Sequence, residues 1–415
     1  MKGLLCILIF IFAGCGISDK LSRENLSTYY DSALDELEPS SVIYHFSPDS
    51  SRCYFKIPFS NLLTVNNGVS FVARVKVHFE LFATYNAKTF TDSGTVFSEA
   101  LAADSIKWLY GSFAFSLPIG REAIIKLVYK DVNRKVESLQ LINCKKTSAH
   151  DAQCYLLTDT FNNPLYQSYL LPGEAFKVKN EMDSADLFTV RCYFHHYPFA
   201  YPPFKSSSDL IFNFAADSIF TITKNNISSL KLRKFGFYFF QTDTALKKGI
   251  TIFIFGNEYP LVTKAEELIE PTRYLTTQKE FDNLSSATNK KKAADEFWLS
   301  LSGDPERARE AIRSYYGRTQ DANKLFSSYV EGWKSDRGMI YILYGPPRSV
   351  YRDGLFETWT YNTNPGTPEL LFTFKKMGNP FTDQDYTLIR EPSYESIWYL
   401  AVEQWRQGRI VTSSE

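Results

Sequence analysis

Few residues of this chain have the side chains and spacing that catalysis or metal binding requires. Catalysis of the Ser-His-Asp or Cys-His kind needs an imidazole beside a hydroxyl or thiol. His195 and His196 are the best metal candidates, but neighbours on a strand point to opposite faces and could not hold one ion together. All five histidines precede residue 271, so the last third of the chain offers no such catalytic site: His45, His78, His150, His195 and His196.

Other catalytic patterns are missing from the sequence, with one exception that stays open. There is no P-loop, no dinucleotide-binding glycine fingerprint, no HExxH and no GxSxG. Asp383, Gln384 and Asp385 are more typical of a surface turn than of a calcium loop. Glycoside hydrolysis needs only two converging carboxylates, which any of the 46 acidic residues could supply. We therefore expect a non-catalytic protein without cofactor or metal, and keep a glycan- or cell-wall-acting enzyme or a carbohydrate-binding protein as the alternative.

The first residues predict export and a lipid anchor. Lys2 precedes an apolar run over residues 4–12, which is too short to span a bilayer and is typical of a signal peptide. The run leads into Cys15 in a pattern that resembles the bacterial lipobox, with Phe12 in place of an aliphatic residue. In that pattern, cleavage before the cysteine is followed by acylation. The following Gly16 is not the Asp that retains many lipoproteins in the inner membrane. We expect a lipoprotein anchored through Cys15 in the outer membrane and facing the periplasm, with surface exposure as the alternative.

Four further cysteines lie in the exported part of the chain. They are Cys53, Cys144, Cys154 and Cys192. An exported protein permits disulfides, and four cysteines allow three pairings. We favour Cys53 with Cys144 and Cys154 with Cys192, because each bridge would then lie within one expected module. Buried free thiols are an equal alternative.

The elements that must position these residues are strands in the first two thirds of the chain. After the turn signal Asn67-Gly68, residues 69–81 alternate apolar and polar side chains, the period of a half-buried strand. Several such strands with short turns predict two β-sandwich, immunoglobulin-like modules, and the 34 Phe and 26 Tyr suit packed sheets. The other expected strands are residues 113–117, 125–129, 210–214, 219–223, 235–240 and 250–255.

Near residue 271 the pattern changes to that of helices on a small antiparallel sheet. Helices are expected over residues 293–301, from the N-cap Asp304 to Gly317, over residues 322–333, and from Ser393 onward. This predicts an α+β domain. The strands expected in it are residues 339–344, 357–361, 370–374 and 386–389.

These patterns divide the chain into five segments. Residues 16–40 are polar and lack apolar periodicity, which predicts a tether with at most one short helix. The expected organisation is a signal peptide over residues 1–14, lipid anchor and tether over 15–40, β-sandwiches over 41–147 and 148–270, and the α+β domain over 271–415.

A run of residues in the last domain carries a family resemblance. Gly332-Trp333-Lys334-Ser335-Asp336 resembles the name-giving motif of the GWxTD domain family of bacterial, Bacteroidota-type envelope lipoproteins, with Ser335 where the name has Thr. The likeness covers about the last third of the chain. It implies an envelope location but no reaction or ligand. Further matching residues are Phe297, Trp298, Arg318, Ala322, Asn323, Phe326, Glu357, Trp359, Thr360 and Tyr361.

The residue types of this motif predict a corner between a helix and a strand. Gly332 would let the chain leave the helix, and Trp333 would fill the core. Ser335 or Asp336 would bind exposed backbone N–H groups. The remaining structural positions are a glycine after the motif and a rigid turn beyond it: Gly338, and Gly345 with Pro346 and Pro347.

Arg337 has two possible roles. It could pair with Asp336, Glu357 or backbone carbonyls as part of the corner. Alternatively, Arg337, Asp336, Ser335 and Glu357 could form a pocket that recognises a carboxylate or phosphate on a partner or glycan.

Taken together, these features predict a non-catalytic outer-envelope lipoprotein that acts as an interaction or scaffold component through a GWxTD domain. Its partners would be the membrane, through acyl chains such as palmitate on Cys15, and an envelope protein. A glycan is the possible further ligand. With 46 basic and 46 acidic residues, the chain lacks the basic surplus that binding to nucleic acid requires.

Overall fold

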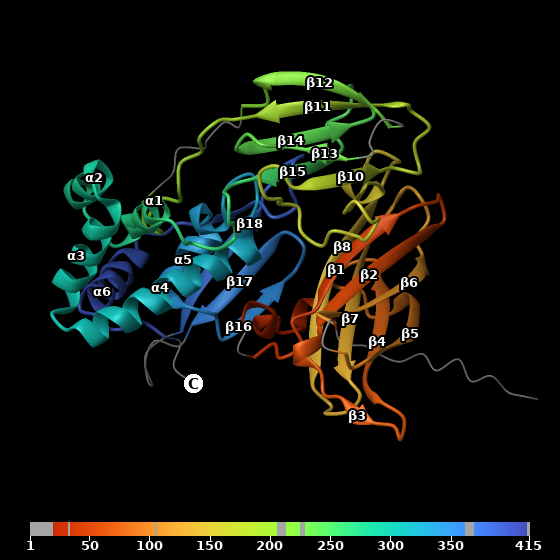
Figure 1. The fold of residues 1–415 in the computed structure, drawn as a ribbon, viewed down its shortest axis with the longest axis horizontal. Coiled ribbons are helices and arrows are strands. Elements are labelled where there is room, and N and C mark those ends of the chain that lie inside the picture. The colour runs from red at the N-terminus through yellow and green to blue at the C-terminus, as the bar shows by residue number, and fades with distance from the viewer. Residues whose placement is uncertain are drawn as a thin grey trace, which may run out of the picture.

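The computed structural model describes residues 20–31, 34–103, 106–205, 213–224, 229–361 and 369–412. Cys15 and the expected signal peptide lie outside these ranges, as do residues 210–212 of one expected strand. Within them, two β-sandwiches precede a domain of helices on a sheet (Figure 1). None of the described helices is long and apolar enough to cross a membrane.

The first sandwich has one sheet ordered β1-β2-β6 and another in which β4 lies beside β3, β5 and β7, with β8 beside β7. Alternate side chains of β4, from Ala73 to Leu81, are buried between the sheets, as the period of two predicts. Val69 and Phe71, at the tip of the hairpin, are exposed. The strands are β1 (Ser40–His45), β2 (Ser50–Pro58), β3 (Val65–Asn66), β4 (Phe71–Phe82), β5 (Phe90–Leu101), β6 (Trp108–Ser116), β7 (Arg121–Asp131) and β8 (Glu137–Lys146), with the 3-10 turn η3 (Phe59–Asn61).

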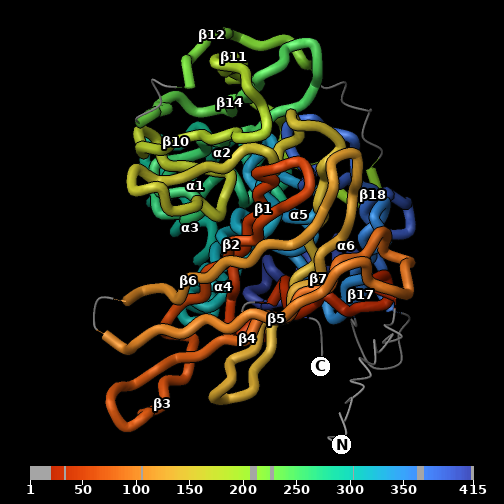
Figure 2. The backbone as a smooth tube through the Cα atoms, turned by 90° about the vertical axis from the view of Figure 1, so that its right-hand side faces the viewer, coloured from red at the N-terminus to blue at the C-terminus, as the bar shows by residue number. Residues whose placement is uncertain are grey.

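The second sandwich lies above the long strands of the first in the view of Figure 2. Its sheets are ordered β13-β10-β9 and β12-β11-β14-β15. Phe176, Val190, Phe240 and Ile252 are completely buried between them. The elements are η4 (Ala152–Cys154), β9 (Leu156–Thr158), β10 (Ala175–Lys179), β11 (Leu187–Tyr193), β12 (Ser218–Thr223), β13 (Leu230–Lys231), β14 (Gly236–Gln241) and β15 (Ile250–Ile254).

All four cysteines of the sandwiches are buried free thiols. Cys53 and Cys144 share the first core, and Cys154 and Cys192 share the second. The members of each expected pair thus lie in one module, but the structure has the free-thiol alternative rather than the two bridges. Burial raises the pKa of Cys144 to about 12, so this thiol stays protonated at neutral pH.

The last domain is α+β, as expected, with helices packed on the antiparallel sheet β16-β17-β18-β19 (Figure 1). Its core contains the indole rings of Trp298, Trp359 and Trp405. The elements are α1 (Ala265–Ile269), η6 (Glu270–Tyr274), α2 (Gln278–Ser286), α3 (Lys290–Ser302), α4 (Pro305–Phe326), η7 (Gly332–Lys334), α5 (Asp336–Tyr344), β16 (Ser349–Arg352), β17 (Phe356–Tyr361), β18 (Leu370–Lys376), β19 (Tyr386–Leu388) and α6 (Tyr394–Arg406).

Several expectations for the helices of this domain were wrong. The helix expected over residues 322–333 is not a separate element, because residues 322–326 end α4 and residues 332–334 form η7. Gly317 does not end a helix, because α4 runs through it from Pro305 to Phe326. The residues before and after the glycine, Tyr316 and Arg318, are buried, and their packing outweighs the cost of about 1 kcal/mol for a glycine in a helix interior. Residues 339–344 belong to helix α5 rather than to a strand. Every residue of α5 is buried, and such a run has no apolar face by which to tell a helix from a strand.

The segment expected to be a tether is docked on the rest of the chain where the structure describes it. We call residues 20–31 the N-terminal latch; it contains η1 (Leu21–Arg23) and η2 (Ser27–Tyr30). The latch lies between β16 and β8 (Figure 1). The Leu26 N–H donates to the Val350 carbonyl at 2.9 Å. Leu21, Leu26 and Tyr30 are buried in the same core as the last domain.

Candidate functional site

Gly332 and Trp333 form the turn between α4 and α5. A Cβ atom on Gly332 would lie 1.9 Å from the carbonyl oxygen of Ala322, so only glycine lets the turn approach the α4 backbone this closely. The Trp333 N–H donates to Asn323 Oδ1 at 3.1 Å, and the Trp333 carbonyl accepts from the Tyr274 hydroxyl at 2.9 Å. The first two motif residues therefore hold helix α4 against the turn.

Ser335 and Asp336 bind backbone N–H groups, as their types predict, although the residues that donate them are buried. Ser335 Oγ accepts from the Gly338 N–H at 3.0 Å and is the N-cap of α5. Asp336 Oδ2 accepts from the Leu388 N–H at 2.7 Å and from Arg390 Nη1 at 3.0 Å. A Cβ atom on Gly338 would lie 2.0 Å from the Gly332 carbonyl oxygen. The roles predicted for Ser335 and Asp336 are confirmed. Gly332 does not end a helix, because α4 already ends at Phe326, and the corner joins two helices, not a helix and a strand.

The turn at Gly345, Pro346 and Pro347 joins α5 to β16, whereas we expected it between two strands. Gly345 has φ +81°, a conformation that favours glycine. Its carbonyl accepts from the Tyr361 hydroxyl at 3.0 Å. The turn thereby fixes the direction in which the chain enters the sheet.

Gly332→Ala should destabilise the protein by about 3 kcal/mol, the upper end of ordinary overpacking costs, because the new methyl group meets backbone rather than a side chain that could move. The matched control is Gly317→Ala in the interior of α4, where an added Cβ meets nothing within 4 Å. This control should stabilise by about 0.5–1 kcal/mol through helix propensity. Urea unfolding of the two variants measures both effects, and equal midpoints would contradict the packing argument.

A buried cluster of polar groups surrounds Glu357, whose side chain is fully buried. Glu357 Oε2 lies 2.8 Å from Arg352 Nε, and Oε1 lies 3.4 Å from Arg337 Nη1. Oε1 also accepts from the Tyr30 hydroxyl at 3.0 Å and from Trp359 Nε1 at 2.9 Å. We call these five residues the Glu357 cluster. It joins the N-terminal latch, α5, β16 and β17.

Charge pairing keeps Glu357 ionised inside the protein. Burial alone would raise the pKa of its carboxyl group, because a charge in a medium of low polarity is poorly solvated. The guanidinium groups of Arg352 and Arg337 reverse this effect and hold the pKa of Glu357 at about 2. The carboxylate is therefore a fixed negative charge between two fixed positive ones.

Arg337 does not form the open pocket that was the alternative interpretation of the motif. Its side chain is 1% exposed, and Nη2 donates to the Gln384 carbonyl at 3.0 Å and to Gln384 Oε1 at 2.8 Å. Its guanidinium carbon lies 4.1 Å from the centre of the Tyr386 ring. With these donors directed inward, Arg337 is a structural tie, while Asp336 and Glu357 bind Arg390, Arg337 and Arg352.

A cavity of about 840 Å³ lies where the three modules meet, next to the Glu357 cluster. Arg352 belongs to both the cluster and the cavity wall. The first sandwich contributes the start of β1 and residues 139–143 of β8, and the second contributes residues 166–171. Lys324, Arg352 and Tyr386 form part of the wall on the last domain.

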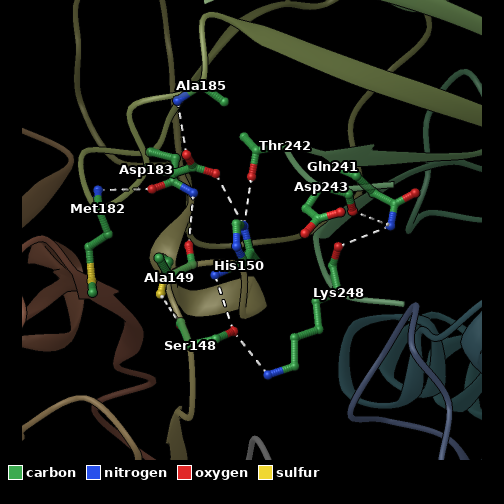
Figure 3. A network of polar contacts seen from close by, with 12 residues as sticks. Ser148, Ala149, His150, Met182, Asp183, Ala185, Gln241, Thr242, Asp243 and Lys248 are labelled. Atoms are coloured by element: carbon green, nitrogen blue, oxygen red, sulfur yellow. Dashed lines mark hydrogen bonds and ion pairs between the residues drawn. The ribbon is translucent and has the colours of Figure 1, made fainter. Parts of the chain in front are cut away.

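Polar side chains hold residues 147–151, which follow the last strand of the first sandwich, against the second sandwich. His150 Nδ1 lies 3.0 Å from Thr242 Oγ1 and 3.1 Å from Asp183 Oδ2 (Figure 3). Lys248 Nζ donates to Ser148 Oγ at 2.9 Å and pairs with Asp151 Oδ1 at 2.9 Å. Both contacts of His150 involve one ring nitrogen, so this group is not arranged as a proton relay from hydroxyl to carboxylate.

The histidine pair that was the best metal candidate does not gather ligands. His195 Nε2 lies 3.8 Å from Asp217 Oδ2. Within the described ranges, no three His, Cys, Asp or Glu side chains converge to hold an ion.

Sequence reasoning missed Tyr30, Arg352 and Gln384. Arg352 had a signal, because Asp353-Gly354 is a hairpin turn pair that places Arg352 opposite Glu357 in β16 and β17. Tyr30 lies 327 residues from Glu357 and had none.

The α+β domain with the Gly-Trp-Lys-Ser-Asp motif at the corner between two helices points to the GWxTD domain class. Residues 236–407 match the model of the GWxTD domain family, and the chain contains a GWxTD domain. No curated protein and no solved structure matches the chain.

The matched region begins at β14, earlier than the boundary expected at residue 271. Strand β14 packs directly on the last domain. Phe381 of the last domain lies against Phe237, Phe239 and Tyr193 of the second sandwich, each ring centre 4.9 Å away. Strands β14 and β15 are therefore part of the support of the GWxTD domain.

Proposed function

We propose that this chain is a non-catalytic lipoprotein of the outer envelope that serves as a scaffold component, anchored through Cys15 and presenting its GWxTD domain to an envelope protein. The observation that carries the proposal is the docking of the N-terminal latch in the core of the GWxTD domain. Only five residue steps separate Cys15 from Lys20, a reach of roughly 18 Å at full extension. An anchor at Cys15 would therefore hold the GWxTD domain close to the membrane.

The use of the motif side chains supports a structural role rather than a chemical one. Trp333, Ser335, Asp336 and Arg337 each bind backbone or side-chain groups of the chain itself. Hydrogen bonds from Gln153 to β8 connect the two sandwiches, and shared hydrophobic cores connect both sandwiches to the last domain. A scaffold needs such a connected body, because partners bound to different modules must keep fixed positions.

Cys15→Ala should move the protein from the membrane fraction to the soluble fraction and abolish metabolic labelling with palmitate, because Cys15 is the expected acylation point. Cys6→Ala, which changes a cysteine of the expected signal peptide, is the matched control and should retain both properties. Palmitate labelling that persists in Cys15→Ala would contradict the anchor.

The scaffold role and the orientation need two further readouts on the same cells. Membranes solubilised in mild detergent should yield the chain in a complex larger than a monomer, and monomeric elution would contradict the scaffold role. External protease should leave the chain intact in whole cells if it faces the periplasm, and cleavage would show surface exposure.

A further inference from the structure

The cavity is lined on one side by the outer edge of β8, whose backbone N–H and C=O groups can bind another strand. Strand β8 pairs with β7 and, among the described residues, with no strand on its other side. Successive residues of a strand direct their N–H and C=O groups to opposite sides. The carbonyl of Lys146 accepts from the N–H of Gly120, just before β7. The N–H and C=O groups of the even-numbered residues of β8 are therefore directed toward β7. Those of the odd-numbered residues are directed away from β7, at the free edge of the sheet.

One side chain already binds part of this edge as a neighbouring strand would. Gln153 Nε2 donates to the Asn143 carbonyl at 2.8 Å, and Gln153 Oε1 accepts from the Lys145 N–H at 2.7 Å. The amide group of Gln153 thus supplies the N–H and C=O groups that one residue of a neighbouring strand would supply. This pair of bonds also confirms that Asn143 and Lys145 point outward.

The edge of β8 at Leu139 and Leu141 has no side chain of a described residue that bonds to its backbone groups in this way. Leu139 and Leu141 also face outward, and their N–H and C=O groups have no hydrogen bond to any residue that the structure describes. Both residues line the cavity of about 840 Å³. Leu141 is 9% exposed and Leu139 is partly buried, so this edge lies inside the junction of the modules rather than on an open surface.

We propose that an extended peptide segment of an envelope partner binds in this cavity by adding a strand to the free edge of β8 at Leu139 and Leu141. The inference rests on the proposed scaffold function and names the chemistry of its partner. Continuing from Gln153, the peptide would run along β8 through the cavity, whose further walls are the latch at Leu26 and Tyr29 and the GWxTD domain at Lys324.

Hydrogen-bond spacing favours a peptide over a glycan. Outward donors and acceptors recur at every second residue of β8, roughly 6.6–6.8 Å apart. The backbone of another strand repeats its N–H and C=O groups at the same interval, which is the basis of recognition by strand addition. A sugar chain has no such alternation. The volume lies within the range of roughly 300–1,000 Å³ that bound ligands usually occupy.

The test uses the full chain in detergent and a library of random decapeptides displayed on phage. Selected peptides are synthesised, and their Kd values are measured by fluorescence polarisation. Leu139→Pro removes one outward N–H without removing a bond to β7, since proline is tolerated where the N–H faces away from the ladder. We expect it to weaken peptide binding at least about tenfold, through the lost bond and the steric bulk of the ring.

Leu139→Ala is the matched control, because it shortens the same side chain and keeps the N–H. It should change the Kd by less than about threefold, and circular dichroism should show both variants folded. Failure to select any peptide, or peptides that bind Leu139→Pro as tightly as the original chain, would overturn the inference. Binding of chitohexaose in the absence of peptide binding would also overturn it, in favour of a glycan. A detergent-stable complex that survives Leu139→Pro would leave the scaffold function standing and place its contact elsewhere.

Discussion

Glu357→Gln should lower the free energy of unfolding by about 3–5 kcal/mol, the usual cost of removing one partner of a buried ion pair. Glutamine fills nearly the same volume but carries no charge, so the guanidinium groups of Arg337 and Arg352 would remain buried without a counter-ion. Their side chains are 1% and 13% exposed, which leaves water little access to replace the carboxylate. Urea unfolding followed by tryptophan fluorescence measures the loss.

Glu280→Gln is the matched control for this variant. Glu280 also pairs with an arginine, at 2.8 Å from Arg406 Nη2, but the two side chains are 37% and 27% exposed. Ion pairs with such access to water contribute at most about 1 kcal/mol. If Glu357→Gln costs no more than Glu280→Gln, the Glu357 cluster does not hold the domain together.

The same argument gives a pH dependence for the original chain. Because the pKa of Glu357 is about 2 in the folded state and 4.5 for an ordinary glutamate, its pairing stabilises the protein fully above pH 4.5. The contribution is lost as the pH falls from 4.5 toward 2, since the unfolded carboxylate takes up its proton first. Glu357→Gln should lack this part of the acid sensitivity.

The sequence predicted elements well where one face of an element meets solvent. Helix α6 and strand β18 each keep a period that separates buried from exposed side chains. Helix α5 keeps none, because all its residues from Asp336 to Tyr344 are buried. For such a run, only the surrounding packing decides between helix and strand, and the sequence does not contain that information in local form.

For the candidate site, the sequence predicted the local roles of the motif residues but not their contacts with distant segments. The motif residues were assigned capping, packing and turn roles because these depend on residue type and near neighbours. That Arg337 pairs with Glu357 was among the stated possibilities, but its burial was not. Burial depends on Tyr30 and Gln384, which reach the cluster from the latch and from a loop before β19. Contacts between such distant segments leave no periodic signal.

Tyr30→Ala should destabilise the protein by about 3–5 kcal/mol, the range for truncating a large buried aromatic residue. Tyr30 is 1% exposed, its ring stacks on Phe326 with centres 5.6 Å apart, and its carbonyl accepts from the Tyr341 hydroxyl at 2.9 Å. Tyr29→Ala is the matched control on the same turn, because Tyr29 is 39% exposed. It should cost less than about 1 kcal/mol.

Tyr30→Phe separates the hydroxyl group from the ring. It keeps the packing on Phe326 but removes the hydroxyl group that contacts Glu357 Oε1 at 3.0 Å and Arg352 Nη2 at 2.8 Å. A buried charged group that loses a partner costs about 1–3 kcal/mol, so the loss of stability in Tyr30→Phe should fall between those of Tyr29→Ala and Tyr30→Ala.

Limited proteolysis should cut the latch quickly in Tyr30→Ala and slowly in Tyr29→Ala, because only Tyr30→Ala loses the contact that fixes η2. If both are cut alike while the GWxTD domain stays folded, the latch is not part of that domain's core, and the argument that an anchor at Cys15 would hold the domain near the membrane fails with it.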